Sequence, residues 1–368
     1  MIKKNHAITK IIQKGFSLIE LLVGLIIGLL TTLVIMQIFS AFEGQKRTTS
    51  GTVDAQTNGS IGLYSLQRDV QLAGFGLPLF DENNMPLNCT TSSFSLPAVA
   101  APPTSLPALN VNLVPITIID GVSATASDTI TVRYGTSASA GIPMRVTADA
   151  AAANVITLDN NIGCAVGDVG FAVHGADCNA IRVRALAGTT SVTVAPAIDV
   201  VVDSVPSLST RLSCAGTWND VTYAISGTQL TKNNVPVVDG IVNMQAQYGV
   251  SADAKQNQIT QWVNATGAWS SPTVANRNRI KAVRIAVIAR NGLLEKTSLP
   301  AVSTACSSIT AANPTGICAW DATSASPTVA SPAPTIDLTN TANWNYYRYK
   351  VYESVIPLRN VIWTRERL

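Results

Sequence analysis

The sequence is poor in charged residues. Lys, Arg, Asp and Glu together make up 13% of the 368 residues, whereas soluble cytosolic proteins carry about 25%. Hydrophobic residues make up 47%, which is enough to build a sizeable core. Small and hydroxylated residues occupy the positions that charges would otherwise fill. This balance favours an exported, β-rich protein over a cytosolic enzyme.

Histidine is also scarce, and the motifs of common active sites are missing. Only His6 and His174 occur, and no two cysteines are spaced as CxxC, which excludes zinc sites of the usual Cys/His spacing. The sequence has no phosphate-binding GxxxxGK[ST], no GxSxG, no HExxH and no EF-hand loop. A catalytic triad through His174, or a metal bound by Asp199 and Asp203, remains as an alternative, but such loop residues usually face water. We therefore expect no enzyme activity, no cofactor and no metal.

The cysteines are even in number and scattered along the chain. In an exported protein this arrangement favours disulfides, although several buried free thiols are the alternative. The pairs closest in sequence, Cys164 with Cys178 and Cys306 with Cys318, are the first candidates for local bridges. The disulfide candidates are Cys89, Cys164, Cys178, Cys214, Cys306 and Cys318.

Basic residues are concentrated before Gly15, where four lysines and no acid occur. Without this segment the 25 basic residues become 21, against 22 acidic ones, so the net charge falls from +3 to −1. The remainder has no overall basic field that would attract nucleic acid.

A long apolar run follows, from Phe16 to Phe42. Its 27 residues (42 − 16 + 1) exceed the roughly 20 that a helix needs to cross a bilayer. The lysines before it predict a cytoplasmic N-terminus and an external body. An ordinary signal peptide would have a shorter apolar stretch and a small-residue cleavage site. A plain signal anchor is the stronger alternative, but it leaves Glu20 unexplained.

Glu20 is the single charged residue within this run. A carboxylate at mid-bilayer costs about 2.5–3.5 kcal/mol, and less near the interface, so such residues usually have a function. Ser17 and Glu20 also fit a capping box at a helix start, with Ser17 as the N-cap. The carboxylate would then lie at the positive end of the helix dipole.

The segment Lys14-Gly15-Phe16-Ser17-Leu18-Ile19-Glu20-Leu21-Leu22-Val23 resembles the class III leader of type IV prepilins and of type II secretion pseudopilins. The resemblance implies that a membrane peptidase removes residues 1–15 and methylates the amine of Phe16. It further implies that Glu20 pairs with the N-terminal amine of a neighbouring subunit during assembly. An unpaired carboxylate in the membrane is penalised much more than a paired one, so this pairing would set the register of the subunits.

The resemblance implies a pilin-like ladle of the α+β class: a long N-terminal helix packed on an antiparallel β-sheet head with an elaborated β-rich region. Apolar spacing predicts a helix over residues 16–73, spanning the membrane at 16–42, with a kink or melted stretch near 44–60 because Gly and Thr cluster there. The exported head covers 74–368, with a second β lobe expected at 92–250. Runs rich in Val, Ile and Thr predict strands at 113–119, 129–134, 155–158, 170–174, 181–185, 191–194, 221–225, 235–248, 280–290 and 346–357.

Three further segments are similar to PilW-type minor pilins of the type IV pilus: Arg68–Gly76, Val283–Arg290 and Tyr347–Asn360. The first ends the helix at glycines, and the last ends in Leu-Arg-Asn. The Ala/Ser/Pro-rich stretches at 92–109 and 321–335 match no family pattern. Aromatic and basic residues alternate near the C-terminus in a way that suits single-stranded nucleic acid, but strand alternation favours a core role, and nucleic-acid binding is not expected. These residues are Trp344, Tyr346, Tyr347, Arg348, Tyr349, Lys350, Tyr352, Arg359, Trp363 and Arg365.

The resemblance implies a structural subunit that helps to initiate, assemble or stabilise a type IV pilus, and thereby motility, adhesion or DNA uptake. The expected partners are other minor pilins, the major pilin, the prepilin peptidase and the inner-membrane assembly platform. The protein would lie in the bacterial inner membrane with a periplasmic head, and on the pilus after assembly. The alternatives are a minor pseudopilin of a type II secretion system, an adhesive or ligand-binding head on a pilin anchor and, more remotely, an exported enzyme.

Overall fold

A computed structural model describes residues 15–77, 86–98, 105–123, 125–206, 208–295, 297–299, 315–320, 334 and 336–362. The chain divides into two units, Met1–Ser50 and Gly51–Leu368. The first unit consists, in its described part, of residues 15–17 and the beginning of one helix. The second contains the rest of that helix and all of the described strands.

Helix α1 (Leu18–Gln71) is the longest element, and it confirms the predicted N-terminal helix. Ser17 caps its start, because the Ser17 Oγ accepts a hydrogen bond from the amide of Ile19 at 3.3 Å. The capping box predicted the amide of Glu20 as the donor instead. Along the apolar run, Thr31 Oγ1 donates to the Ile27 carbonyl and Thr32 Oγ1 to the Gly28 carbonyl, which satisfies both hydroxyls within the helix.

The predicted interruption near residues 44–60 is wrong, because α1 is helical throughout this range. Thr48 Oγ1 donates to the Gly44 carbonyl one turn earlier. Within the second unit, Gly51, Ala55 and Gly59 are buried. These small residues allow close packing against the head, which outweighs the poor helix propensity of the two glycines.

The first sheet of the head has the strand order β15-β14-β16-β17 and is antiparallel throughout. Its strands are β14 (Ile241–Ser251), β15 (Ile259–Val263), β16 (Ile280–Arg290) and β17 (Tyr349–Pro357). Short helical turns lie between them or follow them: η2 (Gly267–Trp269), α2 (Val274–Arg277), η3 (Trp344–Tyr346) and α3 (Arg359–Ile362).

A second antiparallel sheet has the order β13-β12-β11-β4-β3. It comprises β3 (Ile116–Ile119), β4 (Thr129–Tyr134), β11 (Asn219–Ser226), β12 (Gln229–Lys232) and β13 (Val235–Asp239). The principal core joins both sheets to the second half of α1, through Leu66, Tyr223 and Ile285 among others. The packing of the helix on antiparallel sheets confirms the predicted α+β class.

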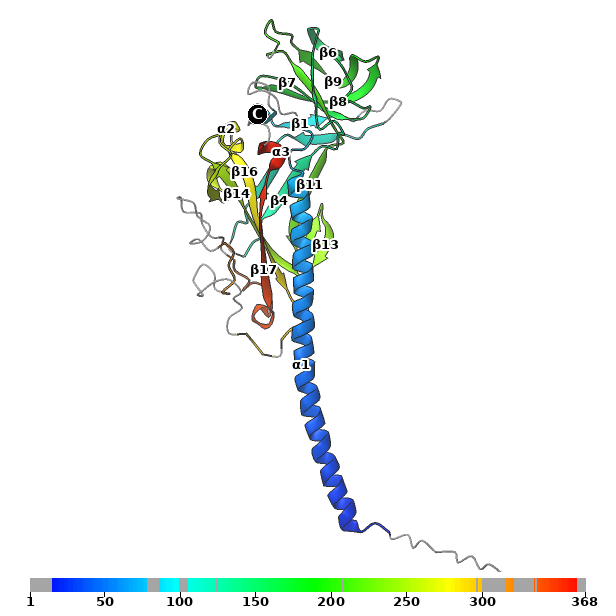
Figure 1. The fold of residues 1–368 in the computed structure, drawn as a ribbon, viewed down its shortest axis with the longest axis vertical. Coiled ribbons are helices and arrows are strands. Elements are labelled where there is room, and N and C mark those ends of the chain that lie inside the picture. Colours follow the sequence, from blue (N-terminus) through cyan, green and yellow to red (C-terminus); the bar gives the residue numbers. More distant parts are fainter. Residues whose placement is uncertain are drawn as a thin grey trace, which may run out of the picture. The chain divides into compact units, whose positions relative to one another are not determined.

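Between β4 and β11 the chain forms a third, six-stranded sheet, which we name the inserted barrel (residues 143–216). Its order is β5-β10-β7-β8-β9-β6. A bridge between Val146 and Leu158 joins the ends of the two outer strands and closes the sheet on itself. Apolar side chains such as Ile181 and Leu212 fill its interior. The strands are β5 (Pro143–Arg145), β6 (Ala150–Thr157), β7 (Val169–His174), β8 (Asp177–Ala187), β9 (Ser191–Val200) and β10 (Arg211–Gly216), and β6 to β9 lie together in Figure 1.

A small hairpin of β1 (Ser93–Leu96) and β2 (Leu109–Asn112) packs on the outer face of the inserted barrel. It is preceded by the short turn η1 (Pro86–Asn88). Part of the Ala/Ser/Pro-rich stretch at 92–109 therefore forms a strand and buries Leu96. The 321–333 part of the second such stretch lies outside the described residues.

Each range predicted as a strand overlaps an observed strand. The range 235–248 was predicted as one strand, but Gly240, with φ of 74°, divides it into β13 and β14. The strands β1, β2, β5, β10, β12 and β15 were not predicted. The division of the chain into domains as expected from the sequence stays a prediction.

Candidate functional site

The first half of α1 is an apolar surface, and the described residues of its unit, 15–50, provide nothing that covers it. Its large hydrophobic side chains are all at least half exposed, from Phe16 and Leu18 to Phe42. The helix is long and apolar enough to cross a membrane. Such a surface in water would be an aggregation hazard, so it requires a bilayer or other protein chains around it.

Glu20 lies in the first turn of this helix. The helix dipole there favours a negative charge, and the Ser17 cap fixes where the helix begins. Gly15 and Phe16 precede the helix as exposed residues outside any helix or strand. A bond in such a segment is accessible to a peptidase, and its cleavage after Gly15 stays a prediction.

In the second unit, α1 approaches the head through its glycines. A side chain at Gly59 would overlap the ring of Tyr352 on β17. At Gly51 an added Cβ would lie 3.0 Å from the Cβ of Asn291, which follows β16. Spacing alone could not identify this role, because the aromatic partner lies almost 300 residues away in the sequence.

Asp69 anchors the helix to the second sheet. Its side chain is 1% exposed, and its Oδ2 lies 2.5 Å from Lys232 Nζ and 2.8 Å from the hydroxyl of Tyr223. Burial, together with the negative charge of Asp69, raises the pKa of Tyr223, so this hydroxyl remains a hydrogen-bond donor. The carboxylate is thus compensated by a cation and a hydroxyl donor, with the exposed Arg68 guanidinium at 3.6 Å as a weaker partner, and removal of Lys232 would leave it poorly compensated.

The C-terminal end of α1 meets the C-terminal part of the chain. Asn360 Nδ2 donates to the carbonyls of Gln71 and Ala73, each at 3.2 Å. Gly74, at φ of 77°, turns the chain and donates its amide to the Arg133 carbonyl. The helix-ending and Leu-Arg-Asn segments, which the sequence singled out separately, therefore form one capping structure.

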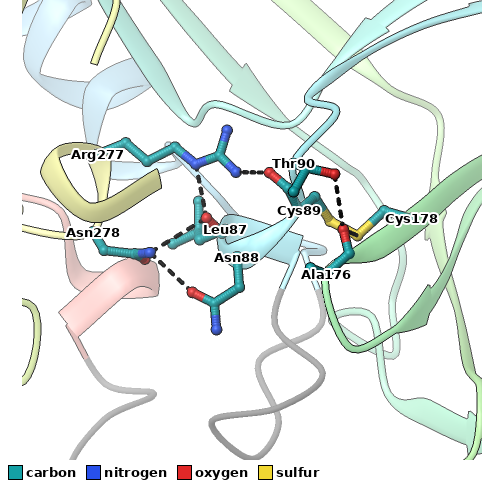
Figure 2. The surroundings of a disulfide bond; sticks show 8 residues. All are labelled: Leu87, Asn88, Cys89, Thr90, Ala176, Cys178, Arg277 and Asn278. Carbon is teal, nitrogen blue, oxygen red and sulfur yellow. Dashed lines mark hydrogen bonds between the residues drawn. A yellow bond between two sulfur atoms is a disulfide. The ribbon is translucent and has the colours of Figure 1, made fainter. Parts of the chain in front are cut away.

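A second junction connects the first sheet to the inserted barrel through residues 86–98, which we name the strap. Figure 2 shows the guanidinium of Arg277, on α2, pointing at the strap, where it donates to the carbonyls of Leu87 and Cys89. Asn278 Nδ2 donates to Asn88 Oδ1 at 2.9 Å. Burial lowers the pKa of Arg277, but the group stays cationic.

On its other side the strap is fixed to the hairpin between β7 and β8. Cys89 forms a disulfide with Cys178, and the Thr90 amide donates to the Ala176 carbonyl at 3.1 Å (Figure 2). The strap is thus held by side-chain hydrogen bonds at one edge and by a covalent bond at the other.

The disulfides differ from the local pairs expected from the sequence. Cys164 pairs with Cys214 and not with Cys178, because Cys214 lies opposite Gly170 of β7 and Cys178 opposite Val173. Positions three residues apart on a strand face opposite sides of the sheet. Cys318 is also disulfide-bonded, but Cys306 lies outside the described residues, so that pairing stays a prediction.

Three of the aromatic residues near the C-terminus pack on the face of the first sheet opposite α1, whereas Tyr352 packs on the α1 side, and Trp363 and Arg365 lie outside the described residues. Tyr349 is buried there, and Trp344 and Tyr347 are half-buried against it. On the same face Arg284 is enclosed by the rings of Trp262 and Trp320, at 5.0 and 4.5 Å. Burial lowers the pKa of Arg284 to about 10. This arrangement is a packed core with an internal cation, as strand alternation predicted for the aromatics; the absence of nucleic-acid binding stays a prediction.

The residues considered for catalysis or metal binding form ordinary surface contacts. His174 Nε2 lies 3.3 Å from Asp203 Oδ2, both partly exposed. Asp199 Oδ1 accepts a hydrogen bond from the amide of Ala152. Within the described ranges no group of three or more His, Cys, Asp or Glu side chains is arranged to hold a metal ion. The expectation that the protein is not an enzyme stays a prediction.

Comparison with protein families gives one match. Residues 201–360 match the family model described as Type IV Pilus-assembly protein W, PilW. The matched part begins before β10 and ends at Asn360, so it contains the first sheet and leaves out most of the inserted barrel and the strap. No curated protein matches the chain. No solved structure matches it either.

Proposed function

Because residues 201–360 match the PilW family of type IV pilus-assembly proteins, we propose that this chain is a minor pilin. It is a structural subunit that enters the filament through the first half of α1 and helps to initiate or stabilise the pilus. The observation that carries this proposal is an exposed apolar helix with a single carboxylate in its first turn.

Removal of the leader, residues 1–15, is the first step of this function. A peptidase cuts the bond between Gly15 and Phe16, and the new amine of Phe16 is methylated. The exposure of residues 15–17, which lie before the helix, supports this step. Before assembly the protein lies in the inner membrane, with the lysine-rich leader in the cytoplasm and the head in the periplasm.

Glu20 then sets the axial position of each subunit relative to its neighbour in the filament. Its carboxylate is costly in the apolar phase unless an opposite charge approaches it. The amine of Phe16 from an adjacent subunit supplies that charge only at the correct axial step. Other minor pilins and the major pilin are therefore the proposed neighbours, and the inner-membrane assembly platform is the site where they meet.

The test is the composition of sheared surface filaments from cells that carry the wild-type chain or Glu20→Ala. We expect a wild-type peptide that begins with N-methylated Phe16, and a strong reduction of the variant in filaments although its leader is still removed. Glu43→Ala is the matched control, because Glu43 is an exposed carboxylate of the same helix beyond the apolar run and should leave incorporation unchanged. Normal incorporation of Glu20→Ala, or a chain that keeps residues 1–15, would refute the proposal.

A minor pseudopilin of a type II secretion system is the second candidate, because it would have the same leader and Glu20. Deletion of the gene separates the two: loss of surface filaments supports the pilus, and loss of protein secretion with intact filaments supports the pseudopilus. The exposed inserted barrel also leaves room for an adhesive function, which a binding screen with the full chain in detergent would detect.

A further inference from the structure

One end of the first sheet carries exposed leucines. Leu293 and Leu294 follow β16 after Asn291 and Gly292, and they are 45% and 42% exposed. Single exposed leucines are ordinary on protein surfaces, whereas adjacent ones beside other apolar groups often mark an interaction site. The residues around this pair and its position along α1 indicate what covers it.

Aromatic residues border the two leucines. The amide of Glu295 donates to the Tyr346 carbonyl at 2.8 Å, which holds residues 292–295 beside the turn η3. The aromatic side chains of η3 and of Tyr347 are half-buried, so part of each ring stays open to the surroundings. We name residues 292–295 and 344–348 the basal tip.

The charges of the basal tip are basic on the outside. Arg348 Nε lies 2.7 Å from Glu295 Oε1, and the Arg348 side chain is 46% exposed whereas that of Glu295 is 14% exposed. Beside them, Arg290 Cζ lies 4.1 Å from the centre of the Tyr347 ring. Two cations thus accompany one largely enclosed carboxylate. Leucine, aromatic and basic side chains together are typical of protein surfaces that meet lipid headgroups.

The basal tip lies at the end of the second unit where α1 enters it. A Cβ added at Gly51, the first residue of that unit, would lie 3.0 Å from the Cβ of Asn291. At the opposite end of the sheet, Asn360 caps the C-terminus of α1. Strands β16 and β17 therefore run along α1. The residues that follow β16 and precede β17 extend beyond the sheet in the N-terminal direction of the helix.

The length of α1 between the apolar run and the head matches a contact with the bilayer surface. Nine residues (51 − 42) separate Phe42, the end of the run, from Gly51. A rise of about 1.5 Å per residue makes this about 14 Å of helix. The headgroup layer on each side of a bilayer takes up about 5–7 Å of that length. Two or three extended residues, at about 3.3 Å each, cover the rest, and the loop 292–295 supplies them.

We propose that the basal tip rests on the periplasmic surface of the inner membrane before assembly, with Leu293 and Leu294 among the phospholipid headgroups and Arg348 beside their phosphates. A lipid surface accounts for the apolar pair, the half-open aromatic rings and the outward cation together, and the membrane-spanning segment brings it within reach. The contact fixes the orientation of the head until the subunit leaves the membrane for the filament. The inference rests on the proposed function, because it requires that the apolar run spans the inner membrane.

Photocrosslinking in living cells tests this contact. The full chain carries a benzophenone amino acid in place of Leu293, Phe39 or Ile162, one site at a time. Phe39 lies within the apolar run, whereas Ile162 is an aliphatic residue of the inserted barrel that is 84% exposed. After illumination, mass spectrometry of the chain should find phospholipid adducts at positions 39 and 293. The yield at position 293 should exceed the yield at position 162 several-fold.

A lipid adduct at position 39 but not at position 293 would overturn the proposal and leave the minor-pilin function intact. An adduct of position 293 with a protein chain in place of lipid would overturn it too, because protein would then cover the leucines. Equal lipid yields at positions 162 and 293 would show unspecific contact and have the same consequence. Absence of a lipid adduct at position 39 would instead refute the membrane insertion on which the proposed function depends.

A set of variants provides a second readout, with the benzophenone in place of Tyr346. Leu293→Asp with Leu294→Asp should lower the lipid adduct several-fold, because a carboxylate favours water over an apolar environment. Ile162→Asp is the matched control, since it also replaces an exposed aliphatic side chain, and it should leave the yield unchanged. Equal yields from chains of equal thermal stability would contradict the proposal, and if the double variant does not fold, the crosslinks at position 293 decide.

Discussion

The side-chain amide of Asn360 lies 3.2 Å from the carbonyl oxygen of Gln71, the last residue of α1, although 288 positions separate them in the sequence. Helix C-termini leave carbonyls without an internal partner, and here the end of the chain supplies the donor. The long helix is thus fixed at its end by the same segment that completes the first sheet.

Replacement of Asn360 should test this cap. Asn360→Ala removes the donor and should lower the free energy of unfolding by about 1 kcal/mol, as loss of a neutral hydrogen bond does. Asn360→Asp should cost more, because a carboxylate offers no donor and adds negative charge at the negative end of the helix dipole. Urea denaturation of the full chain in detergent measures both, and equal stability of Asn360→Asp and the wild type would contradict the assignment.

Gly59 should not tolerate even the smallest side chain. Gly59→Ala pushes a methyl group into the ring of Tyr352 and should destabilise the second unit by about 1–3 kcal/mol through overpacking. Gly44→Ala is the matched control, because an added Cβ at Gly44 meets nothing within 4 Å and should improve helix propensity. The double variant Gly59→Ala with Tyr352→Leu should recover part of the loss, as measured by thermal unfolding.

The buried Asp69–Lys232 pair gives a double-mutant prediction. Lys232→Met leaves the Asp69 carboxylate with the Tyr223 hydroxyl and the more distant, exposed Arg68 guanidinium, and should cost about 3 kcal/mol. Adding Asp69→Asn should restore part of the stability, because the uncompensated charge is gone. Lys255→Met, at an exposed position, serves as the control for loss of a lysine. Additive effects of the two substitutions would show that no coupling exists between them.

Stability should depend on pH through Asp128. Burial, and to a smaller extent the negative charge of Asp120, raise the pKa of its carboxyl to about 7, although hydrogen bonds from the amides of Gly121 and Ala246 oppose this shift. In the unfolded chain the same group titrates near 3.8. The folded state therefore binds more protons between these values, and this contribution to stability is present below about pH 4 and lost as the pH rises through about 7. Denaturation at several pH values should show that the free energy of unfolding depends less on pH in Asp128→Asn than in the wild type between pH 5 and 8. The same pH dependence in both would exclude Asp128 as the origin of the effect.

The two assigned disulfides should have separable effects. Cys89→Ser with Cys178→Ser should expose the strap and the β7–β8 hairpin to hydrogen exchange while the barrel core stays protected. Cys164→Ser with Cys214→Ser should loosen the barrel core itself, because Cys214 is fully buried there. Each pair should cost about 2–4 kcal/mol. Identical exchange maps for the two variants would contradict the distinct roles of the bridges.

Local sequence signals predicted the parts of the fold that depend on local physics. The apolar run and the Ser17 cap predicted α1, and branched residues predicted most long strands. Strand β6 was only partly predicted, because its first residues are alanines, which have little preference for strands. Strands such as β1 and β12 are short, and they are stabilised by their neighbours more than by their own residues.

The long-range contacts could not be read from the sequence. The roles of Gly59 and of Asn360 depend on partners hundreds of residues away, and the strap depends on Arg277, which had no distinguishing motif. Sequence proximity also misled the disulfide prediction, since Cys164 and Cys178 are near in the chain but lie on opposite faces of one sheet. By contrast, Glu20 is conspicuous without any structure, because it is a charge in an apolar run, and its role in assembly stays a prediction.

The way in which the inserted barrel enters the head has a consequence for how such proteins diversify. Tyr134 at the end of β4 is paired with Asn219 at the start of β11, so the two chain crossings lie side by side. A short turn could therefore replace residues 135–218 and leave an ordinary hairpin in the host sheet. The inserted barrel can therefore be exchanged as a module by recombination while the host sheet and α1 are kept unchanged.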